Sequence, residues 1–260
     1  MNTAVYSLSA DPNDFSVMYA GFNGGSCSNP PPICEPDTYF NTTGATHKTI
    51  DGGLTWMELD ALYTPDLRII VVEVHPTDPN LIYAATFSKL TTPGEGAGDF
   101  EGVAQLGVLR SRDGGVTWSS STSGMGDDPR EQALLGMAVL PADPSRLFVP
   151  ASSNASYWSS DGGETFHRTA RMIAFAYDSH DPEGLHMLGS NGEFILENQD
   201  GGEIWTRKAP TPGFVSFQEA VPTVIVWSPS YPKAVFLAWA LRGGLQILGW
   251  RRDLETGSFG

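Results

Sequence analysis

The sequence predicts an all-β fold built from repeated antiparallel units, and three observations carry that prediction. A phrase centred on Asp-Gly-Gly occurs four times, a phrase centred on Asp-Pro precedes each copy, and helical spacing of apolar residues is nowhere sustained. The chain has 260 residues with 29 glycines and 19 prolines, which suits many short strands joined by tight turns. We expect one domain spanning residues 1–260, a length that can bury a sizeable core.

The Asp-Gly-Gly phrase occupies residues 50–56, 112–118, 160–166 and 199–205. Asp-Gly between alternating apolar runs is typical of a β-hairpin, because glycine adopts positive φ without a Cβ clash. The aspartate can accept hydrogen bonds from N–H groups of its own turn, and the closing aromatic is expected to start the outgoing strand. The residues expected to build these turns are Asp51, Trp56, Asp113, Trp118, Asp161, Phe166, Asp200 and Trp205.

The Asp-Pro phrase reads as strand, turn, strand, because proline cannot donate to a sheet ladder. Combined with the hairpin, it gives strand A, Asp-Pro turn, strand B, loop, strand C, Asp-Gly-Gly turn and strand D. This is the four-stranded antiparallel blade of a β-propeller, and a repeat of roughly 40–65 residues fits such blades. The expected blades span about 4–60, 69–122, 134–169, 172–208 and 221–260.

The fifth expected blade is incomplete, since its Asp-Pro is replaced by Tyr231-Pro232 and no strand D follows its strand C. Two arrangements stay open. Five blades could close into a small ring with an imperfect seam, which we favour, or the chain could be part of a larger propeller. An uncovered blade edge exposes unpaired N–H and C=O groups, so a partner chain completing the last blade is a further expectation.

The hairpin phrase resembles the Asp-box, or BNR repeat, with the pattern Ser/Thr-x-Asp-x-Gly-x-Thr-Trp/Phe. Residues 49–56, 111–118 and 159–166 match it in full, whereas the fourth copy has Asn198 and Ile204 in place of hydroxyl residues. The resemblance implies a propeller with each box between the third and fourth strands of a blade. Sialidases, xyloglucanase-type glycoside hydrolases, sortilin-type receptors and photosystem assembly factors carry such boxes, so the resemblance implies no single function. The pattern is nearest to the sortilin and xyloglucanase types.

Charge and composition narrow the function classes. The formal net charge of −15 argues against a nucleic acid or an anionic membrane as partner. No stretch has the length and apolarity needed to span a bilayer, and residues 1–7 show no signal peptide. Cys27 and Cys34 share one Pro-rich loop, where a disulfide would indicate an oxidising compartment and two free thiols would not. We expect the disulfide, and with it an extracellular or periplasmic location whose export signal is not present in this chain.

Strand alternation predicts which face carries function. In an antiparallel A–B–C–D unit the A–B and C–D turns share one face, and the B–C and D–A loops share the other. The repeated turns are short and alike, while the long B–C segments 23–45 and 88–106 belong to the first two blades. Because long loops on a rigid scaffold commonly bind ligands, we expect any site beside blades 1 and 2.

Aromatic and acidic residues in these loops are the candidate ligand-binding groups. Carboxylates and an aromatic in a Gly-rich loop could form a Ca²⁺ site or bind the edge of a sugar, although we favour a solvated acidic loop because no standard calcium pattern is present. No metal-ligand set and no other cofactor is expected. The candidate ligand-binding residues are Tyr39, Phe40, Asp99, Phe100, Glu101, Phe214 and Phe217.

Catalysis would need two carboxylates facing each other across a cleft, as in glycoside hydrolysis. Sialidase-type chemistry is disfavoured because the Arg-Ile-Pro motif of those enzymes is absent, and the histidines show no metal-ligand spacing. Glu73, within a strand A, would be either paired with a neighbour, which we favour, or a ligand group lining the central channel. The candidate carboxylates for a hydrolase are Asp37, Asp99, Glu101 and Glu131.

The favoured interpretation is a non-catalytic, extracytoplasmic propeller that binds a protein or glycan through the loop face over blades 1 and 2. The alternative is a glycoside hydrolase of the xyloglucanase type, or a fragment of one. A photosystem-assembly-like factor is a third interpretation, disfavoured because the arginine patch of that family has no evident counterpart here.

Overall fold

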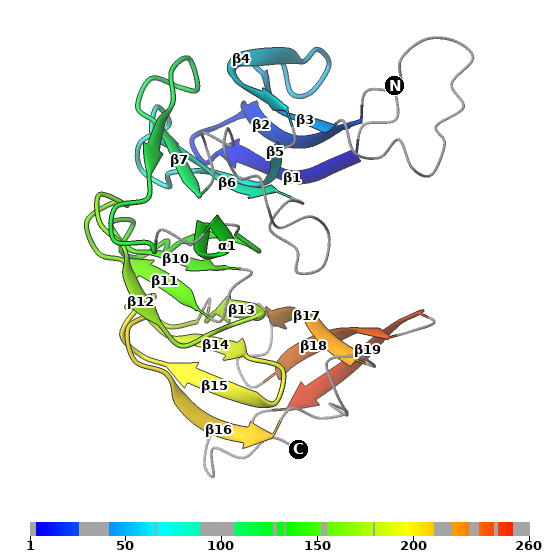
Figure 1. The fold of residues 1–260 in the computed structure, drawn as a ribbon, viewed down its shortest axis with the longest axis vertical. Coiled ribbons are helices and arrows are strands. Elements are labelled where there is room, and N and C mark those ends of the chain that lie inside the picture. The colour runs from blue at the N-terminus through cyan, green and yellow to red at the C-terminus, as the bar shows by residue number, and fades with distance from the viewer. Residues whose placement is uncertain are drawn as a thin grey trace.

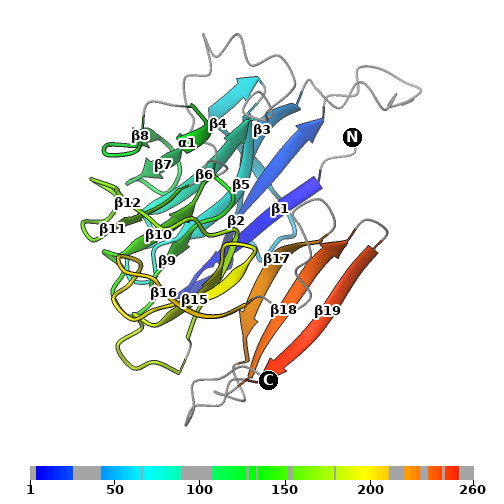
Figure 2. The same cartoon turned by 60° about the horizontal axis from the view of Figure 1, so that its bottom comes forward.

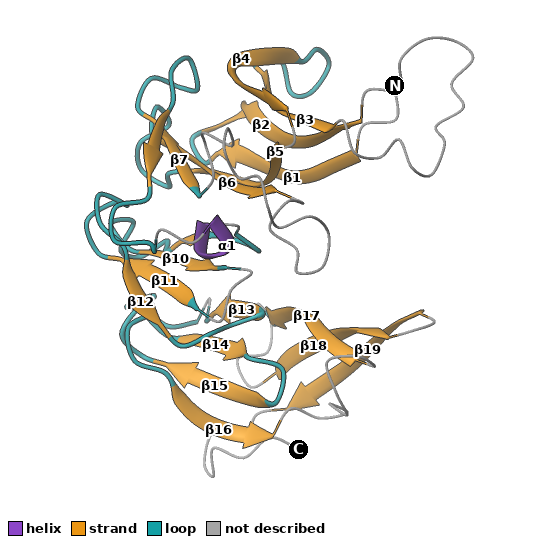
Figure 3. Ribbon diagram, viewed as in Figure 1, coloured by secondary structure: helices purple, strands orange, loops and turns teal. Residues whose placement is uncertain are grey.

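The computed structural model describes residues 4–25, 42–65, 67–88, 107–126, 129–132, 134–151, 155–178, 180–210, 220–228, 234–241 and 244–251. These residues form five antiparallel sheets that follow one another along the chain. In Figure 1 the sheets form an arc, with the first and the last sheet at its two ends. Figure 2 shows the strands β17, β18 and β19 of the C-terminal sheet next to one another, and Figure 3 shows that nearly all regular structure is strand. The one helix among the described residues is α1, Pro129–Gln132.

Blades 1 and 2 are four-stranded sheets in which each strand pairs with the next along the chain. Blade 1 consists of β1 (Ala4–Asp11), β2 (Asp14–Gly25), β3 (Thr42–Thr49) and β4 (Met57–Pro65), and blade 2 of β5 (Leu67–Val74), β6 (Ile82–Ser88), β7 (Val108–Ser111) and β8 (Ser119–Ser121).

Blades 3 and 4 repeat this order, and the last sheet has three described strands. The predicted all-β architecture of four-stranded antiparallel blades is therefore confirmed. Blade 3 consists of β9 (Ala138–Val139), β10 (Leu147–Pro150), β11 (Ser156–Ser159) and β12 (His167–Thr169). Blade 4 consists of β13 (Ala174–Tyr177), β14 (Met187–Ser190), β15 (Phe194–Asn198) and β16 (Thr206–Pro210). Blade 5 consists of β17 (Ala220–Trp227), β18 (Ala234–Leu241) and β19 (Gly244–Arg251).

Each Asp-Gly-Gly turn is held by its own aspartate. In the first, Gly52 and Gly53 have φ of 73° and 92°, which only glycine adopts readily. Asp51 accepts hydrogen bonds from the Thr55 hydroxyl (2.6 Å) and the Thr55 amide (2.9 Å). These bonds stabilise the ionised carboxylate and lower the pKa of Asp51 to about 2. The equivalent bonds from Thr117 lower the pKa of Asp113 to about 2 as well.

The closing aromatic belongs to the turn rather than to the outgoing strand, which corrects the sequence-based expectation. The indole N–H of Trp56 donates to the Gly53 carbonyl (3.1 Å), and β4 begins only at Met57. Trp118 and Trp205 make the same bond within their turns, at 3.0 Å in both. The indole N–H therefore closes the turn both where the ring is partly buried, as in Trp118, and where it is exposed, as in Trp56.

The fourth turn keeps this geometry despite its departure from the pattern. Asn198 replaces the usual hydroxyl residue, and its side-chain oxygen accepts from the Gly202 amide (2.8 Å). In the second turn the Ser111 hydroxyl accepts from the Gly115 amide at the same distance. The Asn198 amide nitrogen also donates to Asp200 and to the Ile204 carbonyl. An amide side chain therefore supplies both the donor and the acceptor that a hydroxyl supplies elsewhere.

The two kinds of turn lie on one face of the molecule, as strand alternation predicts. In each of blades 1 to 4, a glycine amide of the Asp-Gly-Gly turn donates to a carbonyl near the start of the second strand. We call this the turn face and the opposite one the loop face. The four bonds are Gly52 to Ser16 (2.9 Å), Gly114 to Asn80 (2.9 Å), Gly162 to Ser145 (2.8 Å) and Gly201 to Leu185 (3.1 Å).

The hydrophobic core lies between neighbouring blades. Consecutive residues of each second strand point to opposite sides, so Ile82 packs into the core shared with blade 1 and Tyr83 into the core shared with blade 3. Leu147 and Phe148 divide in the same way between the blade 2 and blade 4 sides of blade 3. This alternation stacks the sheets face to face, so that the ends of their strands form the turn face and the loop face.

The B–C connections on the loop face differ strongly in length. β2 ends at Gly25 and β3 begins at Thr42, and β6 ends at Ser88 while β7 begins at Val108. In blades 3 and 4 the same connections run only from 151 to 155 and from 191 to 193. The described part of the chain holds no helix of the length and apolarity that crossing a bilayer requires.

Candidate functional site

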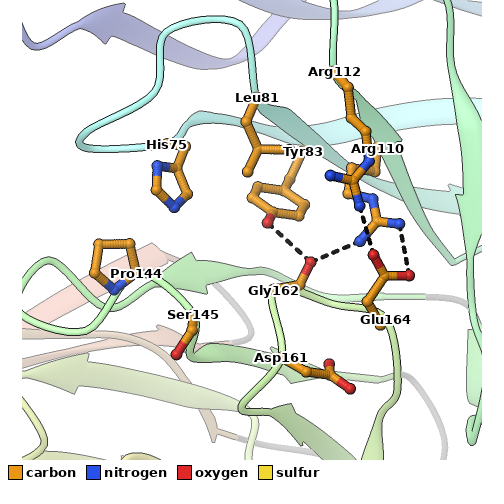
Figure 4. Close-up of a pocket in the computed structure, with 10 residues that line it drawn as sticks. All are labelled: His75, Leu81, Tyr83, Arg110, Arg112, Pro144, Ser145, Asp161, Gly162 and Glu164. Atoms are coloured by element: carbon orange, nitrogen blue, oxygen red, sulfur yellow. Dashed lines mark hydrogen bonds and ion pairs between the residues drawn. The ribbon is translucent and has the colours of Figure 1, made fainter.

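A pocket of about 280 Å³ opens on the turn face between blades 2 and 3. Blade 2 contributes its first turn and the ends of β6 and β7, and blade 3 contributes both of its turns (Figure 4). The lining residues are His75, Leu81, Tyr83, Arg110, Arg112, Pro144, Ser145, Asp161, Gly162 and Glu164.

The carbonyl oxygen of Gly162 is the meeting point of the pocket (Figure 4). It accepts a hydrogen bond from the Tyr83 hydroxyl (3.0 Å) and one from Nη1 of Arg110 (2.9 Å). Burial raises the pKa of Tyr83 to about 12, so the phenol stays protonated and keeps donating. Both donors come from blade 2 and the acceptor from blade 3, so these bonds fasten one blade to the next.

Glu164 neutralises the two arginines of the pocket. Its carboxylate pairs with Nη2 of Arg110 at 3.0 Å and also accepts from Arg112. The hydrogen bond and the positive charge of Arg110 lower the pKa of Glu164, so the carboxylate stays ionised. Nε of Arg110 is buried and has no partner within the described ranges. With its strongest donors already engaged, the pocket is better suited to holding blades together than to binding an anion.

His75 closes the other side of the pocket as a neutral ring. Its Nδ1 accepts hydrogen bonds from the amides of Thr77 (3.3 Å) and Asp78 (3.2 Å). Burial lowers the pKa of His75, although the charge of Asp78 acts in the opposite direction. A nitrogen that accepts two backbone hydrogen bonds is not available as a base, so His75 has a structural role in its turn.

A similar hydrogen bond from one blade to a turn carbonyl of the next, which we call a joint, recurs at two other boundaries. Between blades 1 and 2, the Tyr19 hydroxyl (3.1 Å) and Lys48 Nζ (3.2 Å) donate to the Gly114 carbonyl. Between blades 3 and 4, Nη1 of Arg146 donates to the Asp200 carbonyl (2.6 Å). Sequence reasoning missed these joints. A signal exists in blades 2 and 3, where Tyr83 and Phe148 each lie five residues after the aspartate of their Asp-Pro turn. Phe148 makes no joint hydrogen bond, but its ring packs on Trp205 of blade 4, with ring centroids 5.2 Å apart.

Glu73 lies beside the joint between blades 2 and 3 and has no partner among the described residues. It lies across the β5–β6 ladder from Tyr83, and no hydrogen bond or ion pair within the described part of the chain reaches it. Burial raises its pKa to about 7. The expectation that Glu73 is paired with a neighbour is therefore not met among the described residues.

His186 lies at the boundary between blades 4 and 5, next to two carboxylates. Its Nδ1 lies 3.0 Å from Asp178 and its Nε2 lies 2.9 Å from Glu197, so only the protonated ring can donate to both carboxylates. The ring also stands edge-on to Trp227 of blade 5 at 5.0 Å. Among the residues that the structure describes, no group of three or more His, Cys, Asp or Glu side chains could hold a metal ion.

Most residues singled out from the sequence as ligand-binding or catalytic lie outside the described residues. Glu131 is the exception, and it follows the start of α1 and pairs with Arg168 at 3.2 Å. That ion pair ties the end of blade 2 to blade 3 and gives Glu131 a structural partner. The residues outside the described ranges are Cys27, Cys34, Asp37, Tyr39, Phe40, Asp99, Phe100, Glu101, Phe214 and Phe217.

Comparison with known proteins defines the class. No protein-family model matches the chain. No curated protein matches it either. Among solved structures, similar chains include an ancestral GH74 enzyme (TM-score 0.58, 15% identity, 98% of this chain and 37% of that one). They also include YCF48 bound to D1 peptide (TM-score 0.57, 15% identity, 99% of this chain and 66% of that one). An oligogalacturonate lyase in complex with manganese is similar as well (TM-score 0.62, 10% identity, 99% of this chain and 68% of that one).

These likenesses establish the fold, and at 10–15% identity they establish nothing further. The chain is a β-propeller built of antiparallel blades. It spans between about a third and two thirds of the length of the structures that it resembles.

Proposed function

We propose that the chain is a non-catalytic binding propeller that recognises a protein or glycan through the loop face over blades 1 and 2. The observation that carries this proposal is the unequal length of the B–C connections. Sixteen residues separate β2 from β3 and 19 separate β6 from β7, whereas five separate β10 from β11 and three separate β14 from β15. Long connections in two neighbouring blades are typical of a binding face on a rigid scaffold.

The turn face supports the proposal by contrast. Its polar side chains are engaged within the protein: Tyr83 and Arg110 bind Gly162, and Glu164 binds both arginines of the pocket. Its aspartates are held by turn hydroxyls and amides. A face whose hydrogen-bonding groups are already used in joining blades contributes little to ligand recognition.

The ligand class follows from charge. A net charge of −15 favours a ligand that carries no net negative charge, such as a neutral glycan or a basic peptide. YCF48, one of the similar propellers, was solved with a bound peptide, which supports a peptide as one ligand to test. The extracytoplasmic location and the Cys27–Cys34 disulfide belong to the same proposal, and a chelator tests the alternative that the acidic loop binds Ca²⁺.

The test uses glycan and basic-peptide arrays, probed with and without chelator. Wild-type protein is compared with a variant whose residues 90–105 are replaced by a short Gly-Ser linker and with the turn-face variant Arg112→Ala. The proposal expects hits that the loop replacement abolishes and that Arg112→Ala keeps. Hits that survive the loop replacement and are lost in Arg112→Ala would overturn it. Turnover of β-glucans by the wild type would instead support a glycoside hydrolase of the GH74 kind.

A further inference from the structure

The connection from β8 to β9 is a further long segment of the loop face, and we call its residues 122–137 the strap. Sixteen residues separate β8 from β9, whereas one separates β4 from β5, four separate β12 from β13 and nine separate β16 from β17. Among the described strands, blade 2 therefore has both the longest B–C connection and the longest connection to a following blade. The structure describes the strap at 122–126, 129–132 and 134–137.

The long B–C connection of blade 2 leaves and re-enters the sheet at Thr86 and Gly107, which we call the neck. The Thr86 amide (3.0 Å) and the Thr86 hydroxyl (3.1 Å) both donate to the Gly107 carbonyl. The Gly107 amide donates to the Thr86 hydroxyl at 2.8 Å. Thr86 is fully buried, so these bonds determine where both ends of the connection stand.

The strap packs directly on the neck. The amide of Leu134 donates to the Thr86 carbonyl at 3.0 Å. Gly107 has a φ of 102°, and a methyl group placed on it would lie 2.3 Å from Cγ2 of Thr122. Only glycine fits both this backbone angle and this close approach. The beginning and the later part of the strap therefore both contact the neck.

The strap is also fastened to blade 3. The amide of Phe166, in the third Asp-Gly-Gly turn, donates to the Ser123 carbonyl at 2.7 Å. Nη1 of Arg168, on β12, pairs with Oε1 of Glu131 in α1 at 3.2 Å. The strap thus joins the neck of blade 2 to the outer strands of blade 3.

The strap is a packed element rather than a loose link. Met125 and Leu134 are buried in the core that blades 2 and 3 share. Nε2 of Gln132 donates to the Gly126 carbonyl at 3.0 Å, which folds α1 back on the start of the strap. Because its parts are held to one another, a displacement of α1 is transmitted to the neck.

We propose that the strap positions the long B–C connection of blade 2, so that Gly107, Glu131 and Arg168 are positioning residues of the binding face. The inference rests on the proposed function, because it concerns how the loop face over blades 1 and 2 presents its ligand-binding segments. The neck determines where the connection begins and ends, and the strap holds the neck relative to blade 3. Binding groups keep their geometry only when the residues behind them are held by packing and hydrogen bonds.

Hydrogen exchange followed by mass spectrometry tests the positioning without a ligand. Glu131→Arg and Arg168→Glu each place like charges opposite one another, and the double variant restores an ion pair with its charges exchanged. Each single variant is expected to speed exchange of the Thr86 and Gly107 amides by about two- to fivefold, and the double variant to exchange at the wild-type rate.

The matched control is the B–C connection of blade 4, where the amides of Gly192 (3.1 Å) and Phe194 (2.9 Å) are also hydrogen-bonded. Their exchange is expected to stay unchanged in all three variants. Neck amides that exchange at the wild-type rate in both single variants would overturn the proposal. So would faster exchange that appears equally at the blade 4 control, because it would show a general loss of stability.

Binding of the strongest hit from the glycan and basic-peptide arrays gives the second readout. Gly107→Ala is expected to weaken binding about tenfold, because relieving the strain displaces the neck. Adding Thr122→Ser removes the clashing Cγ2 and is expected to recover part of the affinity. Circular dichroism establishes that both variants are folded, and the charge-exchange pair replaces them if they are not.

Wild-type affinity in Gly107→Ala would overturn the positioning role. If no array hit depends on residues 90–105, the proposed function fails instead, while the exchange measurement still decides whether the strap positions the neck.

Discussion

The hydroxyl of Tyr83 donates a hydrogen bond of 3.0 Å to the carbonyl oxygen of Gly162, across the boundary between blades 2 and 3. Tyr19 and Gly114 form the same contact one blade earlier, at 3.1 Å. The second, third and fourth Asp-Gly-Gly turns therefore do two things: each reverses the chain within its own blade and presents a carbonyl to the blade before it. This coupling explains why the turns resemble one another while the loops on the opposite face do not.

Tyr83→Phe is expected to lower the free energy of unfolding by about 1 kcal/mol, because one hydrogen bond is lost while Arg110 still donates to the Gly162 carbonyl. Urea denaturation measures the change. Tyr177→Phe is the matched control, since Tyr177 is exposed, and it should leave the free energy of unfolding unchanged. Equal effects of the two substitutions would contradict a specific joint at Tyr83.

Glu73 gives the protein a stability that falls as pH rises. Its pKa is about 7 in the folded state against an ordinary value of 4.5, so the unfolded chain loses this proton at lower pH than the folded one. The stabilisation is complete below pH 4.5 and is lost as pH rises through about 7, which amounts to about 3 kcal/mol.

Glu73→Gln should remove most of that dependence, and at pH 8 the variant should be more stable than the wild type. Thermal unfolding between pH 5 and 8 measures both effects, with Glu193→Gln as an exposed control. A wild-type profile that is flat over this range, or one that Glu73→Gln leaves unaltered, would mean that Glu73 is paired after all.

Asp113→Asn should destabilise the second turn at neutral pH, because the amide accepts the Thr117 hydrogen bonds less strongly than the carboxylate does. The pKa of Asp113 is lowered to about 2, so its contribution is present above the ordinary value of 3.8 and is lost as pH falls through about 2. Unfolding curves of variant and wild type should therefore converge in acid. A difference that persists unchanged at pH 2 would assign the effect to something other than the charge.

The fourth turn tests whether its stability depends on a hydrogen-bond acceptor at position 198 or on asparagine in particular. Asn198→Ala should cost about 1–3 kcal/mol, because the buried Gly202 amide loses its acceptor. Asn198→Ser should cost less, since Ser111 and Ser159 fill this place in the second and third turns. Chemical denaturation of the two variants side by side gives the comparison, and a serine variant as unstable as the alanine one would refute the equivalence.

Local turn chemistry made the fold predictable from sequence. Asp-Gly-Gly and Asp-Pro determine backbone shape within a few residues, so the hairpins at Asp51 and Asp113 and the shared turn face follow from the pattern alone. The joints were not predictable, because Tyr83 and Gly162 are 79 residues apart and meet only through the stacking of two blades. The pattern predicts that Trp56 starts a strand, because it does not reveal that the indole N–H closes the turn.

The candidate site was less accessible to sequence reasoning for a related reason. Unequal insertions single out blades 1 and 2, but the chemistry of a long loop depends on which of its side chains converge, and spacing carries no such information. Glu131 illustrates the difficulty: its loop position makes it a candidate acid, whereas in the structure it pairs with Arg168 of the neighbouring blade.

The most direct test of the division between a structural turn face and a binding loop face is a quantitative binding measurement on one identified ligand. Calorimetric titration should show that replacing residues 90–105 by a Gly-Ser linker abolishes binding, while Arg112→Ala leaves the affinity within a factor of two or so of wild type, as expected for an exposed ion pair. Unchanged affinity in the loop variant together with lost affinity in Arg112→Ala would contradict this division.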